Sequence, residues 1–269
     1  MRRIAIYGKG GIGKSTVSAN ISDALAARGL KVMQIGCDPK ADSTALLTGT
    51  PRVRPVLDLM RAGEEITLEA IIGRGRSGCL CAECGGPKPG TGCAGRGIIA
   101  AFEQLERLGA IETYRPDVLI YDVLGDVVCG GFAMPIRNGY ARDVYIVTSG
   151  EMMALYAANN IAEAVNGFRQ DGYARLGGLI QNSRGVADED GLIDRAAAEM
   201  GTEVVFRVPR DPEVQRCEAA GPTVVRGAPG SAQAEVYRRL AETIYARSED
   251  VGGGMRVGAG KDRGGCRDE

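Results

Sequence analysis

A glycine-rich segment near the N-terminus contains the residue types that bind nucleotide phosphates. It reads Gly8-Lys9-Gly10-Gly11-Ile12-Gly13-Lys14-Ser15, and it lies between an apolar run and a stretch with helical spacing. Glycines allow backbone N–H groups to converge on phosphate oxygens at a helix N-terminus, a lysine neutralises the β- and γ-phosphates, and a serine hydroxyl binds Mg²⁺. We predict an MgATP or MgADP site, with Lys14 catalytic and Ser15 on the magnesium ion, formed by Gly8, Gly10, Gly11, Gly13, Lys14, Ser15 and Thr16.

Acidic residues follow two further apolar runs, and a magnesium nucleotide needs carboxylates nearby. Asp38 follows the second run, and Asp122 ends the third as the aspartate of a Walker-B motif does. Mg²⁺ keeps several waters and takes few protein ligands, so a small number of carboxylates is sufficient. Either residue alone could instead cap a helix. Together with the P-loop they predict a catalytic role for Asp38, a nucleotide-binding role for Asp122, a supporting role for Asp42, and a role for Asp126 in orienting the attacking water.

The chain has eight cysteines and no histidine. The absence of histidine excludes Ser-His-Asp and Cys-His hydrolases, histidine-bound zinc and imidazole acid–base chemistry. In a chain without an export signal, cysteines are poor disulfide partners because the cytosol keeps thiols reduced. Some of them are therefore predicted to be metal ligands or small buried apolar residues.

The apolar pattern predicts the sheet that positions these residues. Short apolar runs, typical of buried parallel strands, alternate with stretches of helical spacing. We predict helices at Lys14–Ala27, Glu151–Phe168 and Ala232–Ala246, and strands at Ile4–Tyr7, Val32–Ile35, Val118–Tyr121, Val144–Thr148, Leu176–Gln181 and Val204–Val208. This alternation indicates an α/β fold with a mostly parallel, doubly wound sheet, and the glycine-rich segment makes it a P-loop NTPase fold.

Composition bounds the size and surroundings of the protein. With 269 residues, 44% of them hydrophobic, and a net charge of -1, we expect one large domain over residues 1–247 and no nucleic acid or membrane partner. The sequence shows no signal peptide or membrane-spanning run, so we expect a cytoplasmic protein. Gly73–Gly97 is rich in Gly, Pro and Cys and is predicted to be a long surface loop, and residues 248–269 are predicted to be a glycine-rich tail.

Several segments resemble the nitrogenase iron protein (dinitrogenase reductase) family, which includes the electron donors of nitrogenase-like reductases. They are Gly85–Gly97, Asp122–Pro135, Ser149–Ile161 and Val208–Asp211. The resemblance extends from Arg3 to about Ala246. It implies an ATP-hydrolysing homodimer that carries a [4Fe–4S] cluster, accepts electrons from a ferredoxin or flavodoxin, and delivers them to a catalytic nitrogenase-like partner.

The resemblance also implies roles for individual residues. Cys93 and Cys129 would bind the cluster across the dimer two-fold axis, two thiolates from each subunit, and both lie in glycine-rich segments whose backbone can donate N–H bonds to sulfur. Arg96 would lie on the face that docks to the partner. The adenine and ribose contacts, which on sequence pattern alone are strand-end and turn residues, would be Asn182, Pro209, Arg210, Asp211 and Gln215.

Lys9 resembles the second P-loop lysine of the deviant Walker-A group of ATPases. In that group this lysine reaches the phosphates that are bound by the partner subunit. We therefore predict that Lys9 is catalytic only in the dimer. The alternative is a solvent-exposed loop lysine.

Other interpretations of the same residues stay open. Cys79, Cys81, Cys84 and Cys93 could form a four-thiolate site for zinc or a second cluster, although their compact spacing is untypical of structural zinc. The alternative is incidental thiols or a redox-sensitive patch. The partner enzyme could be dinitrogenase, a methylthio-alkane reductase or a tetrapyrrole reductase. A partitioning or positioning ATPase without a cluster is the rival in another functional class.

Overall fold

The strands lie side by side with their carboxyl ends along a common edge. The computed structural model describes residues 1–50, 52–86, 94–125, 133–169 and 174–251. In these residues the strands form one sheet in the order β3-β4-β2-β5-β1-β6-β7-β8, and every neighbouring pair is parallel except β3 and β4. The strands are β1 (Arg2–Gly8), β2 (Val32–Gly36), β3 (Gly73–Arg74), β4 (Leu80–Glu83), β5 (Val118–Asp122), β6 (Asp143–Thr148), β7 (Arg175–Asn182) and β8 (Val204–Val208).

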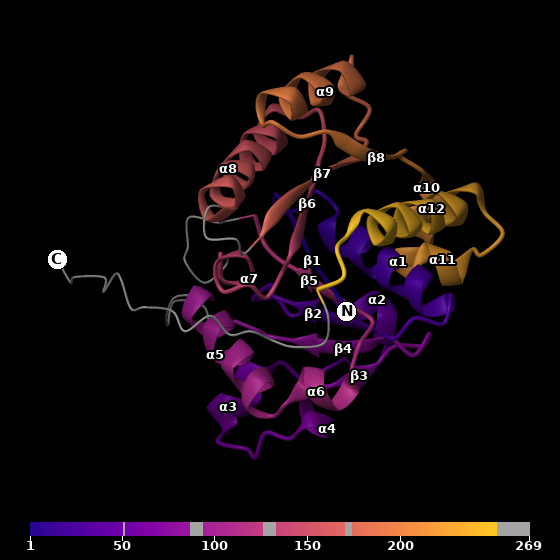
Figure 1. The fold of residues 1–269 in the computed structure, drawn as a ribbon. Coiled ribbons are helices and arrows are strands. Elements are labelled where there is room, and N and C mark those ends of the chain that lie inside the picture. Colours follow the sequence, from indigo (N-terminus) through magenta and orange to yellow (C-terminus); the bar gives the residue numbers. More distant parts are fainter. Residues whose placement is uncertain (51, 87–93, 126–132, 170–173, 252–269) are drawn as a thin grey trace.

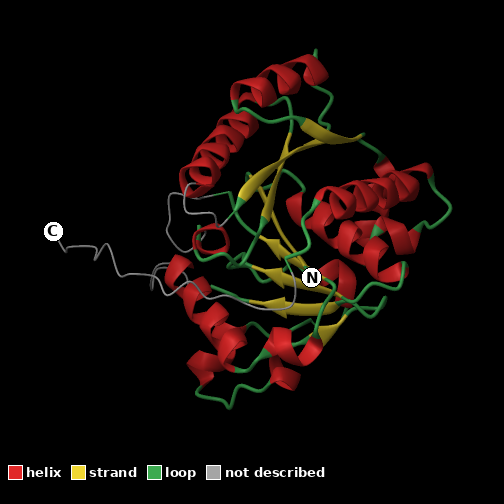
Figure 2. Ribbon diagram, viewed as in Figure 1, coloured by secondary structure: helices red, strands yellow, loops and turns green. Residues whose placement is uncertain are grey.

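Helices cover both faces of this sheet (Figures 1 and 2). One face packs against α1 (Lys14–Ala27), α2 (Ala45–Thr48), α10 (Pro212–Ala220), α11 (Val224–Gly227) and α12 (Ala232–Arg247). The other packs against α3 (Val56–Ala62), α4 (Leu68–Ile71), α5 (Ala94–Arg107), α6 (Ala110–Tyr114), α7 (Met134–Arg137), α8 (Met152–Arg169) and α9 (Glu189–Glu199).

Burial on both faces explains why the strands have continuous apolar sequences. In β1, Ile4 and Ile6 enter the core on the α1 side, while Ala5 and Tyr7 enter the core on the α5 side. Each buried aliphatic side chain contributes about 1.5–3 kcal/mol relative to exposure. In a parallel strand that is covered on both faces, every side chain is buried, so apolar and polar residues do not alternate along its sequence.

The predicted fold class is confirmed, and one predicted segment is wrong. All six expected strands and all three expected helices are present, with α1 matching its expected bounds. The segment Gly73–Gly97 is not one long surface loop, because it contains β3, β4 and the start of α5. β4 pairs in parallel with β2, from Met33 beside Leu80 to Gly36 beside Glu83, and all four of its residues are buried.

The end of the described chain lies beside its beginning. The N-terminal amine donates to Asp250 Oδ1 at 2.6 Å, Arg2 pairs with Asp250 in an isolated antiparallel bridge, and Val251 N donates to Met1 O at 3.2 Å. Residues 248–251 of the predicted tail therefore pack on the domain, and residues 252–269 lie outside the described residues. No helix in the described ranges is long and apolar enough to cross a membrane.

Candidate functional site

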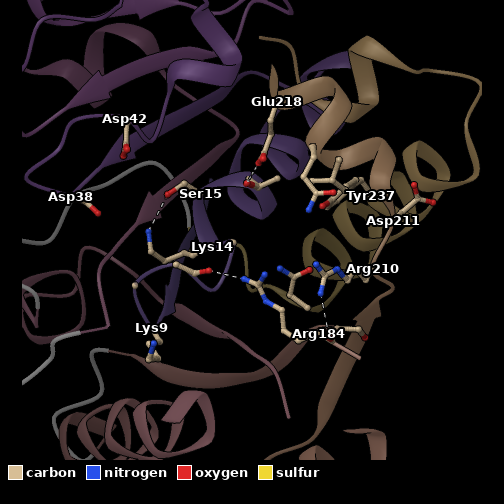
Figure 3. A pocket seen from close by; sticks show the side chains of 18 of the residues that line it. Lys9, Lys14, Ser15, Asp38, Asp42, Arg184, Arg210, Asp211, Glu218 and Tyr237 are labelled. Carbon is tan, nitrogen blue, oxygen red and sulfur yellow. Dashed lines mark hydrogen bonds between the residues drawn. The ribbon is translucent and has the colours of Figure 1, made fainter. Parts of the chain in front are cut away.

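A cavity of about 410 Å³ opens at the carboxyl ends of the parallel strands, where ligands bind in open α/β sheets (Figure 3). Its walls come from the P-loop after β1, the segment after β2, the segment after β7 and the start of α10. The structure brings together most of the residues predicted to bind or process a nucleotide: Lys9, Gly10, Gly11, Gly13, Lys14, Ser15, Thr16, Asp38, Asp42, Asn182, Pro209, Arg210, Asp211 and Gln215.

Glycine at position 13 is required by both the backbone and a neighbouring side chain. Gly13 has φ +94°, in the left-handed region, and a Cβ placed on it would lie 2.5 Å from Asn182 Nδ2. Asn182 in turn donates to Ile12 O at 2.7 Å, so the end of β7 holds the P-loop in place. Helix α1 begins at Lys14 without a side-chain cap or an acidic residue in its first turn. Its first N–H groups are therefore free to bind an anion.

A buried ion pair lies at the base of the cavity. Lys14 Nζ is 2.5 Å from Asp122 Oδ1 and 3.3 Å from Ser15 Oγ, and the exposed fractions of the Lys14 and Asp122 side chains are 5% and 0%. Asp122 Oδ2 has no hydrogen-bond partner within the described residues. An unsatisfied buried carboxylate oxygen costs about 1–3 kcal/mol, so it marks a place for a further donor or cation. Lys14, Ser15 and Asp122 therefore fit a magnesium nucleotide, which adds both phosphate oxygens and a cation with its waters.

The segment after β2 contributes two carboxylates to the opposite wall. Asp38 O accepts from Ala41 N at 3.0 Å, Asp38 Oδ1 accepts from Lys40 N at 2.9 Å, and Ala41 has φ +51°. This tight turn keeps Asp38 buried while Asp42 is exposed to the cavity. In Figure 3 both aspartates lie across the cavity from Arg210 and Asp211.

The wall formed by β7 and α10 contains residues that the sequence did not predict. Arg184 donates to Gly11 O at 2.6 Å, and Arg184 O accepts from Arg210 at 3.4 Å. Asp211 caps α10 through Glu213 N at 2.8 Å, which is a structural role besides the ribose contact that the resemblance implies. The further lining residues are Lys40, Leu124, Ser183, Arg184, Val214, Glu218 and Tyr237. Helical spacing from Gln215 could have found Glu218, which accepts a hydrogen bond from Thr16.

Lys9 lies between this cavity and a second one of about 350 Å³. The second cavity is lined by Lys9, Gly10, Gly11, Ile12, Glu151, Arg184 and Arg210. Lys9 is exposed and makes no ion pair within the described ranges. Figure 3 shows its side chain directed away from Lys14. Its ammonium group is therefore available to an anionic group from outside the subunit.

Glu83 is a buried carboxylate next to the segment after β2, which forms one wall of the nucleotide cavity. Glu83 Oε1 accepts from Thr44 N at 2.7 Å and from Thr44 Oγ1 at 2.6 Å, whereas Glu83 Oε2 has no partner within the described residues. The pKa of Glu83 is raised from 4.5 to about 7. Burial is the main cause, and the charges of Asp122 and Asp42 act in the same direction, whereas the Thr44 hydrogen bonds lower the pKa. The side chain therefore binds its proton more tightly in the folded chain than in the unfolded chain.

The cysteines in and beside β4 do not converge on one point. Cys79 and Cys81 enter the core on the α1 side, while Cys84 enters the core on the α5 side. A hydrogen bond with Cys81 and burial raise the pKa of the Cys79 thiol well above its usual value, and burial raises that of Cys37. Cys81 and Cys84 are three positions apart and so face opposite sides of the sheet. The three thiols of Cys79, Cys81 and Cys84 therefore do not gather into the four-thiolate site that was the alternative. Cys79, Cys81 and Cys84 are all buried, so none of them has the exposed thiolate that a redox-sensitive patch would need.

Three predicted residues have no described position. Cys93, Cys129 and Asp126 lie outside the described residues. Arg96, the predicted docking residue, is exposed in the first turn of α5. Gly8 and Asp122 are not among the residues that line the cavity. Asp122 lies behind Lys14 at the end of β5.

Comparison with known proteins gives one family and several structural neighbours. A model of "4Fe-4S iron sulfur cluster binding proteins, NifH/frxC family" matches residues 2–253. The nitrogenase iron protein of Methanospirillum hungatei JF-1 is 53% identical over 255 residues, which are 93% of this chain and 90% of that protein. The cell division ATPase MinD of Pyrococcus furiosus superposes with a TM-score of 0.68 at 22% identity, over 91% of this chain and 99% of that chain. A ParA family ATPase from Chlorobium tepidum gives 0.65 at 20% identity, over 90% and 98%. The two structural likenesses support the fold alone.

Replacement of Gly13 by Ala should destabilise the protein even without nucleotide. The new side chain would meet Asn182 and would force a left-handed backbone that costs about 1–2 kcal/mol. Chemical denaturation should show a lower free energy of unfolding, and calorimetry should show loss of MgADP binding. Gly10→Ala is the matched control, because its Cβ would meet nothing within 4 Å. Equal unfolding free energies for the two variants would contradict this account of Gly13.

Glu83→Gln should change how stability depends on pH. A pKa of about 7 in the folded chain, against 4.5 unfolded, means that the native state binds the proton more tightly. The wild-type free energy of unfolding therefore falls as pH rises from about 4.5 to about 7. Glutamine does not titrate in this range. The free energy of unfolding of the variant, relative to that of the wild type, should therefore rise by up to about 3 kcal/mol across this interval. Denaturation midpoints at pH 5 and pH 8 test this, with Glu112→Gln on the exposed side of α6 as the control. Parallel pH profiles for wild type and Glu83→Gln would disprove the assignment.

Proposed function

Because the chain belongs to the NifH/frxC family of 4Fe-4S iron–sulfur cluster binding proteins, we propose that it is the ATP-hydrolysing electron donor of a nitrogenase or a nitrogenase-like reductase. The observation that carries the proposal is the 53% identity to a nitrogenase iron protein over 93% of the chain. The function is the transfer of electrons from a bound [4Fe–4S] cluster to a catalytic partner protein, with MgATP hydrolysis controlling each transfer.

The cavity geometry supports the nucleotide half of this proposal. The uncapped start of α1 and Lys14 would bind the phosphates, and Ser15 would bind the magnesium ion. Asp38 and Asp42 lie on the wall where water near the γ-phosphate would be ordered. We assign the orientation of the attacking water to Asp126 and the phosphate-sensing role to Asp122. The adenosine would contact Asn182, Pro209, Arg210, Asp211 and Gln215.

The cysteines Cys93 and Cys129 are the proposed cluster ligands. A [4Fe–4S] cluster is held by four thiolates, so two cysteines per subunit require a homodimer. When bound, the cluster would supply one-electron redox chemistry. The protein would contribute the thiolates, and backbone N–H groups that bond to the sulfurs would tune the reduction potential. Arg96, exposed near the start of α5, is the proposed docking residue for the catalytic partner.

The segment after β5 is the proposed link between nucleotide and cluster. Asp122 ends β5, and Cys129 follows seven residues later in the sequence. A Cβ at Gly125 would lie 2.8 Å from Gly8 O, so the described start of this segment, up to Gly125, packs directly against the P-loop. A change at the γ-phosphate can therefore displace the chain that leads to Cys129, which is the mechanism of γ-phosphate switches.

The specific partner enzyme is the finer part of the proposal. We favour dinitrogenase or a close nitrogenase-like relative over a tetrapyrrole reductase, because the segment Asp122–Pro135 around Cys129 resembles the nitrogenase iron protein family. The upstream electron donor would be a ferredoxin or a flavodoxin. An operon that lacks dinitrogenase subunits would argue against nitrogen fixation and for a methylthio-alkane or other nitrogenase-like reductase.

Anaerobically purified protein should be brown and contain four iron and four acid-labile sulfide atoms per dimer, as one cubane cluster requires. Cys93→Ser and Cys129→Ser should each lose most of the iron and the visible absorbance. Cys217→Ser is the matched control, because Cys217 is buried beside Glu213 and should retain the cluster. A colourless wild-type preparation without iron would favour a cluster-free partitioning ATPase.

Lys9 should act on the nucleotide that is bound by the other subunit. Lys9→Ala and Lys14→Ala homodimers should both lose ATP hydrolysis. A mixed dimer, isolated with two affinity tags after co-expression, should recover roughly half of the wild-type rate, because one of its two sites has both lysines. The measurement is the steady-state rate of phosphate release. A mixed dimer as inactive as its parents would show that Lys9 acts within its own subunit.

A further inference from the structure

The end of β4 lies directly beside the segment that forms one wall of the nucleotide cavity. Cys84 N donates to Gly36 O at 2.9 Å, which extends the pairing of β4 with β2. Beyond it, a Cβ placed on Gly86 would lie 2.7 Å from Pro39 Cα. In the sequence, Cys93 follows Gly86 by seven residues. The described end of the segment that leads to Cys93 therefore touches the turn that holds Asp38.

Glu83 joins these two segments through two hydrogen bonds to Thr44. Its Oε1 accepts both the N–H and the hydroxyl of Thr44, two residues after Asp42. The carboxylate lies across Gly36, where a Cβ would be 2.8 Å from Glu83 Cδ and 2.6 Å from Ser43 Cβ. The Glu83 side chain thus packs closely against Gly36, Ser43 and Thr44.

Packing alone does not account for a carboxylate at this position. Glu83 has 1% of its side chain exposed, and its Oε2 has no hydrogen-bond partner in the described part of the chain. An apolar residue of similar size would avoid the cost of burying an unsatisfied polar group. The feature that an apolar residue could not reproduce is the pair of hydrogen bonds to Thr44.

We propose that Glu83 is a positioning residue that couples the cavity segment 38–44 to Cys84–Gly86, the described end of the chain that leads to Cys93. This inference rests on the proposed function, because it gives a path by which nucleotide exchange reaches one of the proposed cluster ligands. The Thr44–Glu83 hydrogen bonds and the Pro39–Gly86 contact join the two segments at two points. A displacement of the Asp38 turn by nucleotide is therefore passed to the backbone after β4.

Hydrogen–deuterium exchange on the intact dimer tests this coupling. In the wild type, MgATP in place of MgADP should change exchange in the P-loop peptide and in the peptide that contains Cys84–Gly86. Glu83→Leu and Thr44→Val should lose the change at Cys84–Gly86 and keep the change at the P-loop. Glu83→Gln, which retains a carbonyl oxygen for Thr44, should keep both. The matched control is Thr223→Val, since Thr223 is equally buried and bonds the buried carboxylate of Asp23 away from this path.

The outcomes separate this inference from the function on which it rests. A nucleotide-dependent change at Cys84–Gly86 that persists in both Glu83→Leu and Thr44→Val would overturn the role of Glu83 and leave the proposed function intact. The same loss in Thr223→Val would also overturn it, because any buried threonine would then suffice. No response to MgATP at the wild-type P-loop would overturn both proposals. Iron content, measured on the same samples, tests the cluster independently.

Discussion

The ion pair between the Lys14 ammonium and the Asp122 carboxylate fixes the arrangement of the site. It joins the first residue of α1 to the last residue of β5 at 2.5 Å, with both groups almost fully buried. Removal of one partner of such a pair leaves an uncompensated buried charge and costs about 3–5 kcal/mol. The orientation of the P-loop relative to the central strands therefore depends on this contact. A bound phosphate would compete with Asp122 for Lys14, so binding and the geometry at the end of β5 are linked.

The parallel arrangement of the strands brings the other parts of the binding site to this ion pair. Because β2, β5, β1, β6, β7 and β8 all run in the same direction, the segments that follow them meet along one edge of the sheet. The P-loop, the Asp38 turn and the β7–α9 segment come from distant parts of the chain, yet they line one cavity. Side chains such as Asn182 and Arg184 then bond to P-loop carbonyls. Nucleotide binding is consequently shared between both halves of the sheet.

Sequence alone predicts the parts of this structure that depend on local chemistry. Glycine spacing predicts the P-loop and the start of α1, and continuous apolar runs predict the buried strands. The predicted cavity residues lie in the P-loop and in the segments that follow the strands. β4 was missed because its four residues include two polar or thiol side chains and lie in a glycine-rich context. Its burial is set by pairing with β2, which is a long-range contact. Arg184 and the Glu83–Thr44 contact were missed for the same reason, since no periodicity encodes which distant residue a side chain will meet.

The pairing of Met1 and Arg2 with Asp250 has a consequence for fusions to this protein. β1 begins at Arg2 and the nucleotide cavity lies past its other end, so the start of the chain emerges from the edge of the sheet opposite to the cavity. An affinity tag or reporter joined to Met1 would leave the cavity entrance clear. It would also turn the terminal ammonium into a neutral amide, and Asp250 would lose its closest cation.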